Sequence, residues 1–404
     1  MKSGWLSVGL SIVSVVASAQ VDVANLRRHI KVLSADSLQG RGTGSAGEKM
    51  AAAYIEGQFR KMKLAPGNGK DFLQPFPFKG GVHGNGAEGT ANNIVAYINN
   101  GSTHTVVFGA HYDHLGLGEN GSSLDANPQG KIHNGADDNA SGVAGLIELA
   151  RHFQKNKTKE KFNFLFIAFS GEELGLFGSK HFTENPTVDL SKVNYMINLD
   201  MIGRLDPVTK ALAISGTGTS PVWENEIKKL ATDDLKIKTD SAGVGPSDHT
   251  SFYLKNVPVL HFFTGSHSDY HKPTDDWDKI NVDGERSVLQ FIIRLVEDLD
   301  ATPKLAFLTT KNKSMGSTRS FKVTMGVMPS YTSSEEGLKV DGVSDGRPAQ
   351  KAGIMTGDLI VQIGDLPIKD IQAYMDALGK FQKGQTVPVK VKRNGEVITL
   401  TLTF

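Results

Sequence analysis

The chain has 404 residues, of which 39% are hydrophobic, and this suits a globular protein with a sizeable core and more than one domain. Its 44 basic and 43 acidic residues leave a formal charge of +1, which excludes an electrostatic case for binding nucleic acid or an anionic membrane. The absence of cysteine excludes a disulfide framework and a lipid-modified cysteine. Two domains are expected.

The N-terminal segment, residues 1–19, has the features of a secretory signal peptide. Lys2 supplies a positive charge, an apolar stretch runs from Trp5 to Val16, and Ala17-Ser18-Ala19 forms a small-residue cleavage signature. The apolar stretch is short for a membrane span, and a buried N-terminal helix is the alternative. We therefore expect a periplasmic or secreted chain that starts at Gln20 and has no membrane span after cleavage.

Apolar spacing predicts an α/β domain over residues 20–300. Two helices are expected between Val21 and Leu64, the second over about 46–63, followed by a turn-rich stretch up to Gly89. Strands are then expected at 93–98, 105–108, 162–169, 195–199, 211–214 and 257–263, with helices near 141–153, 221–230 and 283–299. This alternation predicts a mixed, largely parallel central sheet with helices on both faces.

The pattern changes after residue 300. Residues 301–320 are rich in Thr, Lys and Ser, which is typical of a linker. Residues 321–404 are rich in predicted strands, with one helix over about 368–381 and an alternating final strand over 397–404. We expect a second, small β-rich domain there.

Side chains that can bind metal follow several predicted strands. Strand 105–108 leads to His111, strand 162–169 leads to Glu173, and strand 195–199 leads to Asp200. In open α/β sheets the functional site lies beyond the carboxyl ends of the strands, so these side chains are expected to lie close together.

Two further segments supply donors of the same kinds. NGADDNASG (134–142) places Asp137 and Asp138 on a turn that opens a helix, where a carboxylate can bridge two cations or can simply cap the helix. SDYHKPTDD (268–276) supplies His271. Imidazoles and carboxylates without a thiolate favour two zinc ions in a hydrolytic site, with cobalt or manganese as substitutes, over a structural zinc.

Nearby polar side chains are expected to orient the histidines. Asp113 follows His111 by two residues and Asp275 follows His271 by four, so each aspartate could accept a hydrogen bond from the imidazole ring. His114 has no evident partner and is expected to line the site rather than to bind metal.

A general base is expected beside the metal ligands. Glu172 directly precedes Glu173 at the end of a wholly apolar strand, where two adjacent carboxylates are unusual as plain surface charge. One can bind metal while the other takes a proton from the attacking water and returns it to the leaving amine. The pattern therefore indicates hydrolysis.

Residues 22–299, including LQGRGTGSAGEKMAAAYI (38–55), resemble the co-catalytic di-zinc aminopeptidase family, which includes bacterial leucyl aminopeptidases and, more distantly, glutamate carboxypeptidases. The resemblance implies a zinc-exopeptidase fold with two zinc ions. It implies that His111 and Asp200 hold one zinc and that Glu173 and His271 hold the other. Asp138 would bridge them, an assignment that rests on the resemblance because Asp137 is chemically equivalent.

The resemblance also implies a reaction. A zinc-bridging hydroxide would attack the first peptide carbonyl of a substrate with a free N-terminus, with Glu172 as base and the Tyr270 hydroxyl stabilising the oxyanion. The segment GPSDHTSF (245–252) lies where the family builds its substrate pocket. Ser247 and Asp248 are therefore candidate pocket residues, with a helix N-cap as the alternative.

The C-terminal region resembles a PDZ domain of the bacterial protease type. Its matching core is GVSDGRPAQKAGIMTGDLIVQIGDLPI (342–368), and MGVMP (325–329) matches the carboxylate-binding loop and the strand that this loop opens. The resemblance implies that a peptide C-terminus or another protein ligand binds between this strand and the helix near 368–381. A domain kept for interdomain packing or dimerisation is the alternative.

Three other functions remain compatible with these motifs. A glutaminyl cyclase-like enzyme uses a similar fold with a single zinc, a carboxypeptidase could use the same fold, and a non-enzymatic peptide-binding protein could depend on the PDZ domain. The complete set of two-metal ligands and the intact Glu172 favour the aminopeptidase.

Overall fold

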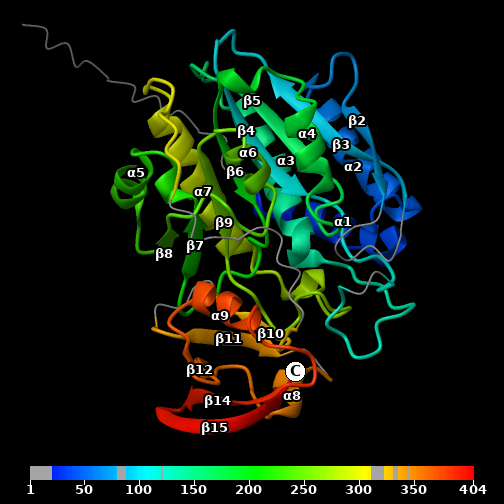
Figure 1. The fold of residues 1–404 in the computed structure, drawn as a ribbon. Coiled ribbons are helices and arrows are strands. Elements are labelled where there is room, and N and C mark those ends of the chain that lie inside the picture. Colours follow the sequence, from blue (N-terminus) through cyan, green and yellow to red (C-terminus); the bar gives the residue numbers. More distant parts are fainter. Residues whose placement is uncertain (1–20, 80–87, 120–121, 311–322, 331–334, 344–345) are drawn as a thin grey trace, which may run out of the picture.

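The computed structural model describes residues 21–79, 88–119, 122–310, 323–330, 335–343 and 346–404. The predicted signal peptide lies outside these residues. Within them, no helix combines the length and the apolar character that crossing a membrane requires. The described residues form two units, each with its own hydrophobic core (Figure 1).

The first unit is built on a mixed sheet. Its strands are β1 (Ala65–Pro66), β2 (Leu73–Lys79), β3 (Glu88–Ile98), β4 (Thr105–His111), β5 (Asn163–Phe169), β6 (Val193–Leu199), β7 (Ala211–Ser215), β8 (Lys236–Asp240) and β9 (Val259–Phe263). They lie in the order β1-β3-β5-β4-β6-β9-β7-β8, and β2 also pairs with β3. The central strands β5, β4, β6 and β9 are parallel, and β3 and β7 flank them in antiparallel orientation. The predicted mixed, largely parallel sheet is confirmed.

Helices cover both faces of this sheet, as predicted. They are α1 (Val23–Leu33), α2 (Ala46–Lys61), α3 (Gly142–Lys155), α4 (Phe177–Glu184), α5 (Trp223–Leu230), α6 (His249–Tyr253) and α7 (Val282–Leu299). Successive strand residues point to opposite faces, so Phe164 and Phe166 of β5 join one core while Leu165 and Ile167 join the other. The first core includes residues of α1, α2, α3, α5 and α7, and the second includes residues of α4 and α6.

The turn-rich stretch expected before Gly89 contains strand β2, so that prediction was wrong in part. Pro75 lies opposite Asn92 and Pro77 opposite Thr90 in the antiparallel pair with β3. Proline has no N–H to donate, so it is tolerated where a strand pairs on one side only. The two prolines made this edge strand look like a loop in the sequence.

The first part of the predicted linker packs against the first unit. Leu305 is buried, and its N–H donates a hydrogen bond to Asn194 Oδ1 at 2.7 Å. The Thr310 N–H donates to the Tyr253 hydroxyl at 3.0 Å. Residues 301–310 are therefore packed against the first unit rather than forming a free linker. Their polar composition suggested a linker, but the buried Leu305 and two main-chain hydrogen bonds hold them in place.

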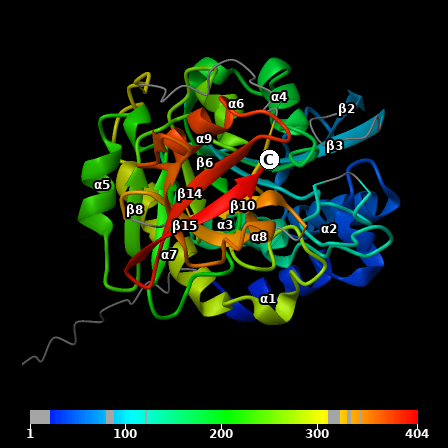
Figure 2. The ribbon, with the colours of Figure 1, turned by 60° about the horizontal axis from the view of Figure 1, so that its bottom comes forward.

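The second unit is a small β-rich domain. Its elements are β10 (Val327–Pro329), β11 (Leu338–Val343), α8 (Pro348–Lys351), β12 (Leu359–Ile363), β13 (Leu366–Pro367), α9 (Ile371–Leu378), β14 (Thr386–Arg393) and β15 (Glu396–Thr403). The strand order is β10-β11-β12-β14-β15, with β13 also paired to β12. Figure 2 shows the long β14–β15 hairpin in red on the near side of this unit. The predicted helix and final strand correspond to α9 and β15.

A buried ion pair stabilises the second unit. Arg393 donates to Asp358 through Nε at 2.7 Å and through its second terminal nitrogen at 2.8 Å. Only 1% of the Asp358 side chain is exposed, against 23% for Arg393. Burial alone would raise the pKa of Asp358, but the hydrogen bonds from Arg393 and from the Met355 N–H, together with the charge of Arg393, outweigh it and lower that pKa. A two-pronged charged contact of this kind is strong.

We expect Arg393→Gln to lower the melting temperature of the second unit, because it leaves a buried carboxylate without its charged partner. The stabilisation is present above the unfolded-state pKa of Asp358, about 3.9, and is lost as the pH falls through the lower folded-state value. Calorimetric unfolding of the full chain at pH 7 and at pH 3 measures both effects. Lys392→Gln removes an exposed positive charge next door and should change neither; equal losses from the two variants would contradict the prediction.

Candidate metal centre

The candidate ligands converge beyond the carboxyl ends of the central strands. His111 is the last residue of β4, Glu173 lies in the turn after β5, and Asp200 directly follows β6. Asp138 comes from the short, irregular helical segment Ala136–Ser141 before α3, and His271 comes from the loop after β9. The structure thus brings together the side chains that the sequence motifs singled out.

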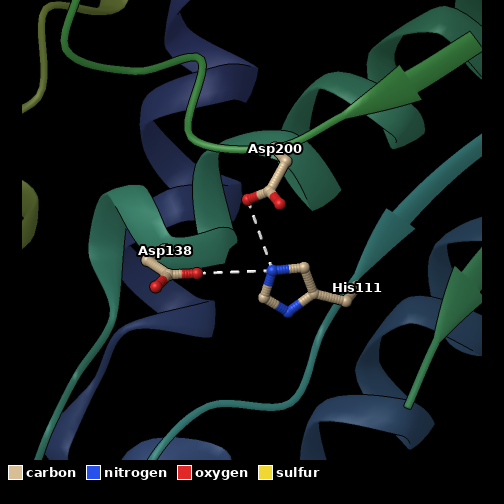
Figure 3. Close-up of side chains that lie close together, drawn as sticks. All are labelled: His111, Asp138 and Asp200. Atoms are coloured by element: carbon tan, nitrogen blue, oxygen red, sulfur yellow. Dashed lines mark hydrogen bonds and ion pairs between the residues drawn. The ribbon is translucent and has the colours of Figure 1, made fainter. Parts of the chain in front are cut away.

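One group of donors forms around His111. Its Nε2 lies 3.3 Å from Asp138 Oδ1 and 3.3 Å from Asp200 Oδ1. Figure 3 shows the two carboxylates pointing at the same ring nitrogen from different parts of the chain. These three side chains could hold one cation.

A second group forms around His271. Its Nε2 lies 3.2 Å from Asp138 Oδ2 and 3.3 Å from Glu173 Oε2. The two oxygens of Asp138 therefore face two different histidines. Asp138 is the carboxylate common to both groups.

The spacing of these donors suits zinc. A tetrahedral zinc ion with bonds of about 2.0–2.1 Å places neighbouring donor atoms about 3.3 Å apart. The four nitrogen-to-oxygen distances around His111 and His271 are 3.2 or 3.3 Å. The donor set therefore fits two zinc ions that share one carboxylate.

His114 contacts the candidate ligand Glu173. Its Nδ1 lies 2.8 Å from Glu173 Oε1, a hydrogen-bond length, and 3.8 Å from Asp138 Oδ2. It could join Asp138 and Glu173 as a donor, but the short distance favours a hydrogen bond to the oxygen that does not face His271. Sequence reasoning missed this partner because Glu173 is distant in the chain.

The predicted partner of His111 acts partly through its main chain. His111 Nδ1 lies 3.2 Å from the main-chain oxygen of Asp113 and 3.7 Å from Asp113 Oδ1. The same Oδ1 accepts a hydrogen bond from the Glu172 N–H at 3.2 Å. Asp113 therefore lies between the ring of His111 and the backbone of Glu172.

The prediction that Asp275 holds the His271 ring was wrong. His271 Nδ1 lies 3.0 Å from the main-chain oxygen of Ser122. Asp275 Oδ2 instead accepts hydrogen bonds from the N–H groups of Asp137 and Asp138, at 2.9 and 3.1 Å. A spacing of four residues brings side chains together on a helix, but residues 271–275 form turns.

Asp137 is directed away from the metal donors. Its Oδ2 lies 3.1 Å from His267 Nε2, and its Oδ1 accepts a hydrogen bond from the Gly203 N–H at 2.7 Å. Asp138 alone of the two neighbours faces His111 and His271. The backbone of the turn thus separates two residues that are chemically equivalent in the sequence.

Arg41 is a buried cation behind the site that sequence reasoning missed. Its guanidinium donates to main-chain oxygens of Tyr112 at 2.8 Å, Asn134 at 2.6 Å and Gly135 at 3.0 Å, and also to that of Leu33. Burial lowers its pKa to about 10 against the attraction of nearby carboxylates, so it is charged at neutral pH. It joins the segment after His111 to the turn before Asp138.

The carboxylates dominate the electrostatics of the site. Burial favours neutral histidines, yet Glu172 and Asp200 raise the pKa of His111 well above its usual value. Glu173 and Asp138 do the same for the pKa of His271. Bound cations would relieve this excess of negative charge, since metals displace protons from such ligands.

The predicted base and the predicted oxyanion donor both lie at the centre. Burial raises the pKa of Glu172 well above its usual value, against the attraction of His111 and with the repulsion of neighbouring carboxylates. The Tyr270 ring stacks on His271 with a centroid distance of 3.9 Å. Burial and the carboxylates raise the pKa of Tyr270, so its hydroxyl keeps its proton and can donate.

The candidate pocket residues are buried at the start of α6. The Ser247 hydroxyl accepts a hydrogen bond from Asn198 Nδ2 at 2.8 Å. Asp248 occupies the N-cap position, but its carboxylate makes no capping hydrogen bond. Burial raises its pKa to about 7. The helix-cap alternative therefore does not account for the Asp248 side chain.

Family models identify both units. Residues 93–296 match the model of peptidase family M28, and residues 315–404 match that of the PDZ domain. The chain therefore belongs to peptidase family M28 and carries a C-terminal PDZ domain. The predicted membership of the zinc aminopeptidase family is confirmed.

Relatives with assigned names include peptidases. The chain is 28% identical over 272 residues to leupeptin-inactivating enzyme 1 of Streptomyces exfoliatus, covering 65% of this chain and 54% of that protein. It is 30% identical over 161 residues to aminopeptidase YwaD of Bacillus subtilis, covering 36% of this chain and 34% of that protein. The matched region thus spans about half of the first relative and a third of the second.

Solved structures share the fold. The LapA aminopeptidase of Legionella pneumophila matches with a TM-score of 0.54 at 22% identity, over 75% of this chain and 81% of that chain. A glutaminyl cyclase of Bacteroides thetaiotaomicron also matches, with a TM-score of 0.54 at 18% identity, over 69% of this chain and 98% of that chain. Because both kinds of enzyme share it, the fold alone does not choose between their reactions.

Proposed function

We propose that this chain is a metal-dependent aminopeptidase that releases N-terminal residues from peptides. The observation that carries the proposal is the shared carboxylate of Asp138, whose two oxygens face His111 and His271 separately. A donor set with two centres favours a two-metal peptidase over an enzyme with a single zinc. The aminopeptidases among the relatives support the same choice.

In this proposal, His111 and Asp200 would hold one zinc, Glu173 and His271 would hold the other, and Asp138 would supply an oxygen to each. When bound, the two ions would supply an activated water near neutral pH and polarise the substrate carbonyl. Cobalt or manganese would suit the same donors. His114 keeps Glu173 in place through its hydrogen bond to Oε1.

The remaining residues of the site move protons and stabilise charge. Glu172 takes a proton from the attacking water and gives it to the amine that leaves. The Tyr270 hydroxyl donates a hydrogen bond to the carbonyl oxygen as that atom becomes negative. The half-buried carboxylates of Glu172 and Asp200 would attract a free α-ammonium group, which limits cleavage to the first residue. Ser247 and Asp248 are the proposed pocket residues.

An assay on blocked and unblocked substrates tests the proposal. We expect the mature chain to hydrolyse aminoacyl anilides and to leave N-acetylated equivalents intact, because the acetyl group removes the positive charge that the carboxylates attract. A chelator should abolish the activity and added zinc should restore it. Equal rates on blocked and unblocked substrates would contradict an aminopeptidase, and cyclisation of N-terminal glutamine would support the cyclase alternative.

We also propose that the PDZ domain binds the C-terminus of peptide substrates. Among the described residues, β10 lies at the end of the sheet order and pairs only with β11, so its other edge could accept an added strand. Gly326 precedes β10 with φ 75°, the kind of backbone that a tight loop requires.

We also propose that the enzyme is exported. The features of the N-terminal segment, residues 1–19, support this proposal.

Deletion of residues 320–404 tests the proposed PDZ function. We expect the full chain to cleave long peptides with a free C-terminus at lower KM than their C-terminal amides, and the deletion to remove that preference. Rates on aminoacyl anilides, which cannot reach both sites, serve as the internal control and should stay unchanged. A preference that survives the deletion would favour a role in packing or dimerisation.

A further inference from the structure

The motif LQGRGTGSAGEKM (38–50) lies against the segment that follows His111, although no proposed ligand or base belongs to it. Gly42 forms a parallel bridge with His114, whose N–H donates to the Arg41 oxygen at 3.1 Å. The motif is therefore fixed beside the metal centre by main-chain hydrogen bonds. One side chain of this motif also reaches the centre.

That side chain is Thr43. Its hydroxyl donates a hydrogen bond to Asp113 Oδ2 at 2.8 Å. The other oxygen of Asp113 accepts the Glu172 N–H at 3.2 Å and lies 3.7 Å from His111 Nδ1. Asp113 itself is fully buried. A single hydrogen bond from Thr43 thus orients a carboxylate that contacts both a proposed ligand and the proposed base.

We propose that Thr43 is a positioning residue, which acts through Asp113 on both His111 and Glu172. This inference rests on the proposed metal centre and peptidase function. Without the Thr43 hydroxyl, the buried carboxylate of Asp113 keeps the hydrogen bond from the Glu172 N–H but loses the one from Thr43. It can then rotate away from His111 and from the Glu172 N–H. The ring of His111 and the backbone of Glu172 would then be held less tightly.

The two parts of the Thr43 side chain have separate neighbours. Its hydroxyl faces Asp113, whereas its methyl group points to the side of Gly171, where a Cβ added to that glycine would lie 3.6 Å from it. Thr43→Val keeps this methyl group and loses the hydrogen bond. Thr43→Ser keeps the hydrogen bond and loses the methyl group. The pair of variants separates positioning of Asp113 from plain packing.

Loss of the hydroxyl should affect both zinc binding and turnover. Partners behind the ligands typically change metal affinity or activity by about 10–100-fold, and we expect Thr43→Val to fall near the lower end, about tenfold, in each. The fall in activity should appear in kcat rather than KM, because the displaced groups orient the base rather than the substrate. Thr43→Ser should stay close to wild type.

A remote threonine supplies the matched control. The Thr302 hydroxyl donates to the main-chain oxygen of Leu299 at 2.7 Å, after the last turn of α7. Helix α7 starts near the centre, because the N–H of its N-cap Asn281 donates to the Gly203 oxygen at 2.8 Å, and its 18 residues carry the chain roughly 27 Å along the axis to the other end. Thr302→Val removes a comparable hydrogen bond far from the centre and should change neither zinc affinity nor kcat.

The experiment uses the full mature chain. Zinc affinity is measured by competition with a coloured chelator, and kcat and KM are measured on an aminoacyl anilide, for wild type, Thr43→Val, Thr43→Ser and Thr302→Val. A tenfold loss in Thr43→Val alone supports the inference. Equal losses in Thr43→Val and Thr43→Ser would overturn it, as would a lowered melting temperature with unchanged zinc affinity and kcat.

The zinc measurement keeps the two proposals distinguishable. A wild-type chain that binds zinc but cleaves no aminoacyl substrate would refute the aminopeptidase proposal alone. The comparison of zinc affinity between Thr43→Val and Thr43→Ser would then still decide the role of Thr43.

Discussion

Glu172→Gln is expected to lower kcat by about 10²- to 10⁴-fold, the usual contribution of a positioned general base. The substitution keeps the size of the side chain and removes only its ability to take a proton. KM and bound zinc should change little, because the donor groups around His111 and His271 consist of other side chains. Steady-state kinetics and metal analysis of the purified protein measure these quantities together.

Glu184→Gln is the matched control for this substitution. Glu184 is exposed at the end of α4, away from the donor groups, and its loss should leave kcat at the wild-type level. If Glu172→Gln retains full activity with its zinc in place, Glu172 is not the base. A loss of zinc together with activity would instead make Glu172 part of the donor set.

Asp138→Asn is expected to empty both metal positions, whereas Asp200→Asn should weaken only the one beside His111. The reason is that Asp138 faces both histidines, while Asp200 contacts His111. Activity of Asp138→Asn should fall by more than the roughly 100-fold that marks the upper range for residues behind the ligands. Zinc per chain after dialysis measures the difference.

Asp137→Asn provides the comparison for Asp138→Asn. It removes the same charge one residue away, but Asp137 bonds to His267 and to the Gly203 N–H instead of facing the donors. We expect it to lower the melting temperature while retaining zinc. Normal zinc content in Asp138→Asn, or loss of zinc in Asp137→Asn alone, would reverse the proposed assignment.

The central sheet could be predicted because its signal is simple. Strands buried on both faces read as continuous apolar runs, and the run that forms β5 is the plainest example. The donors could be predicted for the same reason, since each follows such a run or a turn rich in glycine and aspartate. These features can be recognised without knowing which distant segments of the chain contact one another.

Other features depend on contacts between distant segments, which local patterns do not encode. Glu173 as the partner of His114, and Ser122 as the partner of His271, join residues far apart in the chain. Asp275 was misplaced because its spacing from His271 suits a helix and the backbone there turns. Strand β2 was missed because proline usually marks a break, and only its position at a sheet edge makes it acceptable.

The shared carboxylate makes the two proposed metal positions thermodynamically dependent on each other. A cation beside His111 would fix one oxygen of Asp138 and thereby the direction of the other, which faces His271. The second cation would then meet a preorganised ligand but also the positive charge of the first, and by reciprocity each ion would change the affinity of the other by the same factor. Zinc titrations of this chain should therefore show two coupled affinities rather than two independent ones.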